Sequence, residues 1–89
     1  MTANRRRPYV ENDEYAAFVR RVLRAYARRI ATGDIDALHE LNALFEDVEN
    51  ALGRSVTGLR LHGYSWADIS TRLGVTRQAA HQRWADTRP

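Results

Sequence analysis

The stretch from Gly63 to Trp84 (GYSWADISTRLGVTRQAAHQRW) constrains the fold more than any other part of the chain. Its pattern predicts two short helices joined by a tight turn. Ser65 is placed to cap the first helix through its hydroxyl, with Asp68 three residues later as an acidic form of the capping box. Gly74 suits the left-handed conformation that ends a helix, and Thr76 suits the N-cap of the second helix.

The apolar residues of this stretch fall on one face of each predicted helix. In the first helix they recur at the spacing of a buried stripe and are Trp66, Ile69 and Leu73. The second helix is predicted over residues 77–85, where the helical period turns Ala80 and Trp84 inward. The opposite, solvent-exposed face is expected to hold Gln78, His81, Gln82 and Ala85.

The segment DISTRLGVTRQAAHQRW resembles the helix-turn-helix in the DNA-reading C-terminal region of bacterial sigma factors. In that family E-[IV]-x-x-x-[LF]-G-V-[ST]-R-x-x-[AVI]-x-Q precedes and opens the recognition helix. Asp68 stands in for the acidic residue, and the matching positions are Ile69, Leu73, Gly74, Val75, Thr76, Arg77, Ala80 and Gln82. One position departs, because Arg83 stands where such motifs usually place a second buried aliphatic residue. Trp84 follows it and is a candidate to take over the packing.

The resemblance implies that helix 77–85 lies in the major groove of double-stranded DNA and reads its bases. Arginine and glutamine can bond bidentately to guanine and adenine edges, and no carboxylate that phosphate would repel occurs here before Asp86. The expected base-contacting residues are Arg77, Gln78, His81 and Gln82. The expected phosphate-contacting residues are Ser65, Arg72, Thr76 and Arg83.

The charge of the chain is distributed in three blocks. Residues 1–33 hold eight arginines and three acids, residues 34–50 hold six acids and no arginine, and residues 51–89 hold six arginines and two acids, for a net charge of +3. A basic C-terminal block suits a nucleic-acid reader, because arginine contacts to phosphate release counterions and supply most of the non-specific affinity. The acidic block is expected to face away from DNA.

Residues 1–11 are predicted to form a flexible basic arm, because they lack helical periodicity and hold Arg5, Arg6 and Arg7 before Pro8. Such an arm either stays solvated or enters a minor groove, as homeodomain arms do. The sequence leaves both alternatives open.

Residues 12–53 are predicted to form a helical hairpin with apolar stripes on both helices. The first helix begins at Asn12 or Asp13 and ends at Gly33, and Asp34 caps the second. The first stripe is Tyr15, Phe18, Val19, Val22, Leu23, Tyr26 and Ile30, and the broader second one is Ile35, Leu38, Leu41, Leu44, Phe45, Val48 and Leu52. The basic first helix and the acidic second helix attract each other, across the hairpin or between subunits.

Gly53 is expected to interrupt the second helix or to mark a new start, with Ser55 capping a short helix that ends at His62 and Gly63. This short helix would support the two motif helices and complete a trihelical DNA-binding module over residues 54–89. The sequence thus predicts an all-α chain of about five helices.

The hairpin supplies more apolar surface than a buttress for one small module needs. We therefore expect a homodimer, with an interface formed by Tyr15, Phe18, Val22, Tyr26, Leu38, Leu41 and Phe45. The alternative is that the hairpin folds back on the motif and supports it within one chain.

Composition argues against several other classes. The chain has no cysteine, its histidines His39, His62 and His81 are scattered, and no glycine-rich phosphate loop occurs, so we expect no metal site, no cofactor and no enzymatic activity. No apolar run has the length of a signal peptide or a membrane span, and the expected location is the cytoplasm.

Two classes of function remain. The first is a sequence-specific double-stranded DNA-binding protein, a transcription regulator that works as a dimer. The second is a protein-interaction adaptor, either one that binds RNA polymerase or an antitoxin-like partner, that uses the helix-turn-helix fold for protein contacts.

Overall fold

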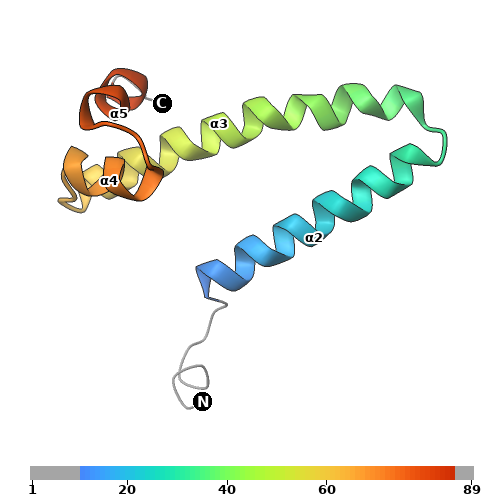
Figure 1. Cartoon of the computed structure of the whole chain (residues 1–89), viewed down its shortest axis with the longest axis horizontal. Helices are drawn as coiled ribbons and strands as arrows, with labels where there is room; N and C mark the ends of the chain where they lie inside the picture. The colour runs from blue at the N-terminus through green and yellow to red at the C-terminus, as the bar shows by residue number, and fades with distance from the viewer. Residues whose placement is uncertain (1–10, 86–89) are drawn as a thin grey trace, which may run out of the picture. The chain divides into compact units, whose positions relative to one another are not determined.

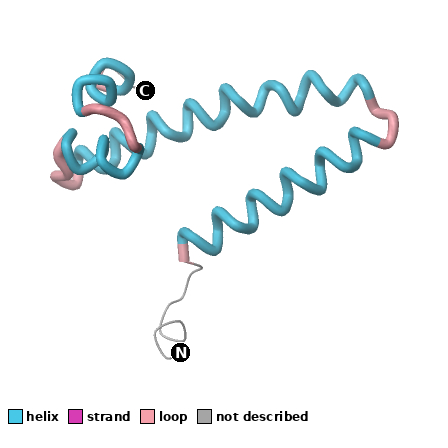
Figure 2. Tube along the Cα trace, viewed as in Figure 1, coloured by secondary structure: helices cyan, strands magenta, loops and turns pink. Residues whose placement is uncertain are grey.

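A computed structural model describes residues 11–85, and over these residues the chain is helical and contains no strand (Figures 1 and 2). The elements are α2 (Asn12–Ala31), the short 3-10 helix η1 (Ile35–Ala37), α3 (Leu38–Leu61), α4 (Trp66–Leu73) and α5 (Arg77–Trp84). The predicted all-α class is confirmed. The expected basic arm, with Arg5, Arg6 and Arg7, lies outside the described residues except for Glu11.

The chain divides into two compact units, Met1–Glu40 and Leu41–Pro89. The first contains α2, η1 and the first three residues of α3. The second contains the rest of α3, followed by α4 and α5. The division therefore falls inside the first turn of α3.

Helix α2 begins and ends where the sequence predicts. Asp13 and Glu14 lie in its first turn and Arg28 and Arg29 in its last, an arrangement that complements the helix dipole at both ends. Gly33, with a φ of 133°, leaves the helical path in a conformation that other residues rarely adopt. A helix therefore stops here for a backbone reason.

The predicted side-chain cap at Asp34 is wrong. Its side chain makes no capping hydrogen bond; instead its carbonyl accepts a bond from Ala37 N at 3.2 Å. This backbone bond closes a turn of 3-10 helix, so α3 starts only at Leu38.

The predicted break at Gly53 is also wrong, and α3 runs without interruption through it. Gly53 is buried in the helix interior. Ser55 does not cap a new helix, because its hydroxyl donates to the carbonyl of Ala51, one turn earlier, at 2.8 Å. A glycine costs a helix about 1 kcal/mol, which a long helix packed against neighbours can tolerate. The described residues thus form four α-helices, against the five expected.

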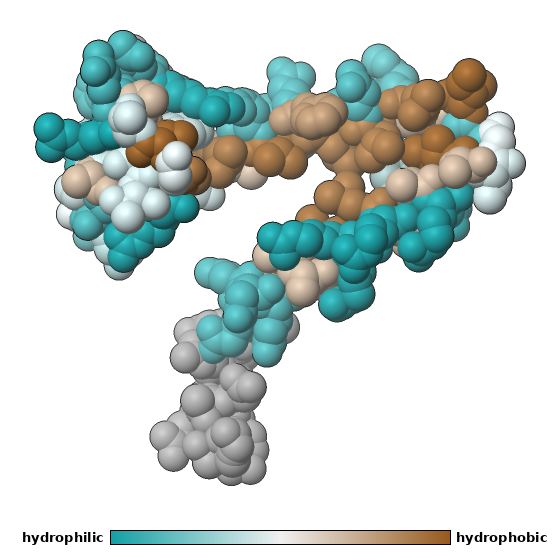
Figure 3. Space-filling model, in the orientation of Figure 1, coloured by the Kyte–Doolittle hydropathy of each residue, from teal (hydrophilic) through white to brown (hydrophobic). Residues whose placement is uncertain are grey.

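The core of the second unit joins α3, α4 and α5. Its buried residues are Val56, Ile69, Ala80 and Trp84, with Leu52 and Trp66 packed against them. Fully burying a side chain such as Val56 or Ile69 contributes about 1.5–3 kcal/mol, so these contacts hold the two short helices against α3. Hydrophobic residues continue along α3 (Figure 3).

Candidate nucleic-acid interface

Helix α4 has the capping box that the sequence predicts. Asp68 N donates to Ser65 Oγ and Ser65 N donates to the Asp68 carboxylate, both at 3.0 Å. Hydrogen bonds with Ser65 lower the pKa of Asp68, and the bond with the main chain of Ser65 lowers it more than the bond with its side chain. Gly74 ends the helix in the left-handed conformation, with a φ of 73°. Both ends of α4 are therefore fixed by adjacent residues.

Helix α5 starts at Arg77, as predicted, because Thr76 Oγ1 accepts a hydrogen bond from Ala79 N at 3.0 Å. Its inward face is also confirmed: Ala80 is fully buried and Trp84 is 5% exposed. Trp84 packs into the core together with Ala80. Its Nε1 is buried and makes no hydrogen bond within the described part of the chain.

The outer face of α5 carries the expected polar side chains. All four residues predicted to contact bases are exposed, namely Arg77, Gln78, His81 and Gln82. Ala85 was expected on this face, but it follows the last residue of the helix and is half-buried. The exposed polar surface of α5 therefore ends at Arg83.

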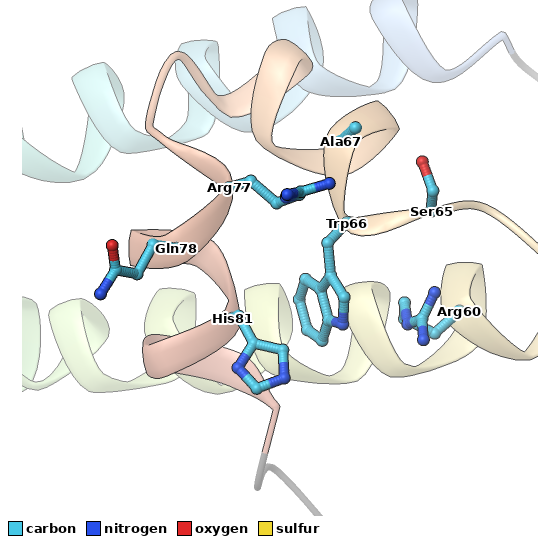
Figure 4. A pocket seen from close by; sticks show the side chains of 7 residues that line it. All are labelled: Arg60, Ser65, Trp66, Ala67, Arg77, Gln78 and His81. Carbon is cyan, nitrogen blue, oxygen red and sulfur yellow. The ribbon is translucent and has the colours of Figure 1, made fainter.

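A hollow of about 450 Å³ lies beside this surface (Figure 4). Its lining comes from the end of α3, the start of α4 and residues 77–81 of α5, and consists of Arg60, Ser65, Trp66, Ala67, Arg77, Gln78 and His81. The lining holds two guanidinium groups, an imidazole and an indole, and no carboxylate. Its chemistry suits an anionic partner.

Three of these side chains form a stack across the three helices. The indole of Trp66 meets the His81 ring edge-on, with centroids 5.2 Å apart and planes at 69°. The Arg60 guanidinium lies 5.1 Å from the centroid of the Trp66 ring. Figure 4 shows the Trp66 side chain between the other two. A cation over an indole contributes about 0.5–1 kcal/mol at an exposed position, so the stack restrains side chains that would otherwise move freely.

Arg60 was not among the residues predicted to contact DNA. It lies in the last turn of α3, in the segment that the sequence assigned to a separate supporting helix, where its periodicity indicates only exposure. Its partner Trp66 was assigned to the core. That residue is half-buried, and it touches both the core and Arg60.

The residues predicted to contact phosphate are dispersed in the second unit. Ser65 lines the hollow, and Thr76 is occupied as the cap of α5. Arg72 is exposed, donates to the carbonyl of Asp68 at 3.2 Å and lies 3.9 Å from its carboxylate. None of these contacts buries the Arg72 guanidinium.

Arg83, in contrast, is held by the acidic segment. Its Nε donates to Glu49 Oε2 at 2.9 Å and its Nη2 donates to Oε1, so the pair is bidentate. This bond, with the attraction between the two charges, raises the pKa of Arg83, and the bond from Arg83 lowers the pKa of Glu49. A phosphate contact by Arg83 remains a prediction, but a phosphate would have to compete with Glu49.

The residues predicted to form a dimer interface are largely exposed. On α2, Phe18 is 52% and Val22 49% exposed, and on α3, Phe45 is 79% exposed. Tyr15 and Leu38 are exposed as well, whereas Tyr26 and Leu41 are half-buried.

Residues 11–85, which the structure describes, contain neither a cluster of metal ligands nor a membrane-spanning helix. No group of three or more histidine or acidic side chains is placed to hold a metal ion. No helix there combines the length and apolar character needed to cross a membrane.

Comparisons with protein-family models, with curated proteins and with solved structures gave no match.

Proposed function

We propose that this protein binds double-stranded DNA with sequence specificity and acts as a transcription regulator, with α5 reading the major groove. The observation that carries the proposal is the outer face of α5. It presents Arg77, Gln78, His81 and Gln82 to solvent, while the opposite face is packed into the core through Ala80 and Trp84.

Two physical features support this reading. A recognition helix has to be rigid, because base contacts depend on a fixed register, and the caps at Thr76 and Gly74 fix the start of α5 and the turn before it. The exposed side chains are donors and acceptors matched to base edges, and no acidic residue occurs among them. An exposed helix without such a role would more often carry Glu, Lys and Ala.

The test is a binding site selected from random duplexes, followed by substitution of Arg77→Ala and Gln78→Ala. Each should weaken binding to the selected site by about 1–3 kcal/mol and leave binding to unrelated duplexes less changed. Arg54→Ala is the control, because Arg54 is an exposed arginine of α3 that does not line the hollow. If Arg77→Ala and Gln78→Ala bind the selected site as tightly as the wild type and Arg54→Ala do, α5 does not read bases.

The same proposal includes a homodimer formed through the apolar stripes of α2 and α3. A single short helix reads few base pairs, and a two-fold axis that doubles the module is the common solution. Two side chains of the α2 stripe, Phe18 and Val22, are about half exposed. Removing them from water would favour association.

Val22→Glu tests the dimer, with Arg24→Gln as a control of equal charge change on the opposite side of α2 by the helical period. Val22→Glu should lower the sedimenting mass and the affinity for a duplex with two half-sites together. A wild-type chain that sediments as a monomer at tens of micromolar, and binds one half-site just as tightly, contradicts the dimer.

One observation favours a second candidate, a protein-interaction adaptor with RNA polymerase as the first partner to test. A mainly apolar groove of about 340 Å³ lies between α3 and α4, lined among others by Leu59, Tyr64 and Leu73, which are all more than a third exposed. A salt titration separates the candidates, because duplex binding must weaken steeply with salt in a DNA reader. A chain with no duplex affinity at low salt fits the adaptor.

A further inference from the structure

We propose that Arg60 binds a phosphate group, and that Trp66 positions Arg60 for this contact. The phosphate belongs to a backbone strand that flanks the groove entered by α5. This inference rests on the proposed DNA-binding function and adds to it a residue on α3, outside the two motif helices.

The Arg60 guanidinium is held in place without being neutralised. Its Nη1 donates to the carbonyl of Tyr64 at 2.9 Å, and its Cζ lies over the Trp66 ring, 5.1 Å from the ring centroid. No carboxylate of the described residues is paired with it. The remaining N–H groups of a planar guanidinium form a fork that matches phosphate oxygens, and an arginine restrained in advance loses less freedom when it binds.

The surroundings of Arg60 favour a negative group. Arg77 lines the same hollow and adds a second guanidinium. The backbone N–H groups of Trp66 and Ala67, in the first turn of α4, donate to no carbonyl within the helix, because the helix begins at Trp66. The cationic pair is the basis of the inference, and the two amides add donors at its rim.

Trp66 links the phosphate contact to base reading. One side of its indole is near Arg60 and its ring also meets His81, which is expected to contact bases. Loss of the indole should therefore disturb both contacts, whereas loss of the Arg60 guanidinium should disturb only the phosphate contact. This difference separates positioning from direct binding.

The experiment measures the affinity of the full chain for its selected duplex and for an unrelated duplex over a range of salt. Arg60→Ala should weaken both duplexes by the same factor and reduce the salt slope by about one unit. Since one phosphate contact contributes a slope of about 0.9, the advantage of the wild type over Arg60→Ala should shrink about 3.5-fold between 50 and 200 mM salt. Arg60→Lys, which keeps the charge, should retain the wild-type slope.

Two further variants sharpen the experiment. Arg54→Ala removes an exposed arginine of the same helix outside the hollow, and it should leave the slope unchanged. Trp66→Phe should weaken the selected duplex more than the unrelated one, because it also loosens His81. Circular dichroism spectra establish that each variant is folded before its affinity is used.

Failure of the phosphate assignment and failure of the proposed DNA-binding function give different results. If the wild type binds no duplex, the proposed function fails. If it binds duplexes and Arg60→Ala keeps the wild-type slope, or Arg54→Ala loses as much as Arg60→Ala, the phosphate assignment is overturned.

A second arm identifies the source of the phosphate. Inorganic phosphate and a mononucleotide are titrated while the indole N–H signals of Trp66 and Trp84 are followed by NMR, with Trp84 as the buried reference. A saturable shift of Trp66 that Arg60→Ala abolishes supports the phosphate chemistry. If that shift occurs but the salt slope of duplex binding is the same in the wild type and in Arg60→Ala, Arg60 binds a free phosphate ligand. The assignment to a DNA strand is then overturned.

Discussion

Two serines test whether α3 is one continuous helix. Ser65 caps α4, where its hydroxyl accepts the bond from Asp68 N. Ser55 lies inside α3 and donates back to the carbonyl of Ala51. The same substitution to alanine should therefore have opposite consequences at the two positions.

Ser65→Ala removes a cap and should cost about 1 kcal/mol, within a range of about 0.5–2 kcal/mol. For a domain of this size, 1 kcal/mol corresponds to a fall in Tm of about 4–8 °C. Ser55→Ala replaces a weaker helix former by the best one at an exposed site. It should leave stability unchanged or raise it by up to about 0.5 kcal/mol.

The assay is thermal unfolding followed by far-UV circular dichroism, at one protein concentration for all samples because a dimer would make the Tm depend on concentration. If Ser55→Ala lowers the Tm as much as Ser65→Ala does, Ser55 is an N-cap. The chain would then contain the separate helix that its sequence suggests, and the continuity of α3 would be refuted.

Two more predictions concern the second unit. Gly58→Ala should raise stability by about 0.5–1 kcal/mol, because a Cβ added there meets no atom within 4 Å, whereas Gly74→Ala should lower it by about 1–2 kcal/mol, because its φ is 73°; melts that rank the two variants in the other order contradict the backbone assignment. Glu49→Gln should lower the Tm at neutral pH. Because Arg83 lowers the pKa of Glu49 in the fold, the contribution is present above the ordinary value of about 4.3 and disappears as the pH falls through the lowered pKa. Glu46→Gln is the control. An equal loss of Tm in both variants at every pH would show that the Glu49–Arg83 pair does not stabilise the fold.

Helices α4 and α5 and the turn between them were the most predictable part of the fold because their determinants are local. Ser65 bonds Asp68 three residues away, Thr76 bonds Ala79, and Gly74 needs only its own backbone freedom. Interactions over so few residues can be read from the order of the chain. They confirm the helix ends, the turn and the inward face of α5.

The error at Gly53 has the opposite origin. Local propensity favours a break, since a glycine with a serine two residues later resembles a helix stop and a cap. The structure buries Gly53 within a long helix whose next turn places Val56 in the core. Packing with residues distant in the sequence outweighed a local preference of about 1 kcal/mol, which no pattern around Gly53 reveals.

The features that complete the candidate interface were invisible for the same reason. Glu49 and Arg83 are 34 positions apart, and the Arg60 stack joins three helices. The sequence indicated an acidic block and a basic block, but not which acid meets which base. It therefore assigned Arg83 to phosphate and left Arg60 unassigned.

Under the proposed function, the Glu49–Arg83 pair and the Arg60 contacts together favour the N-terminal end of α5 as the end that reads bases. The helix has two arginines, and Glu49 neutralises Arg83 near the C-terminal end. Arg77, at the N-terminal end, is paired with no carboxylate of the described residues and shares the hollow with Arg60. The uncompensated positive charge is thus concentrated where the helix dipole is also positive. A polyanion should be attracted to that end first, which is the end that recognition helices generally present to base edges.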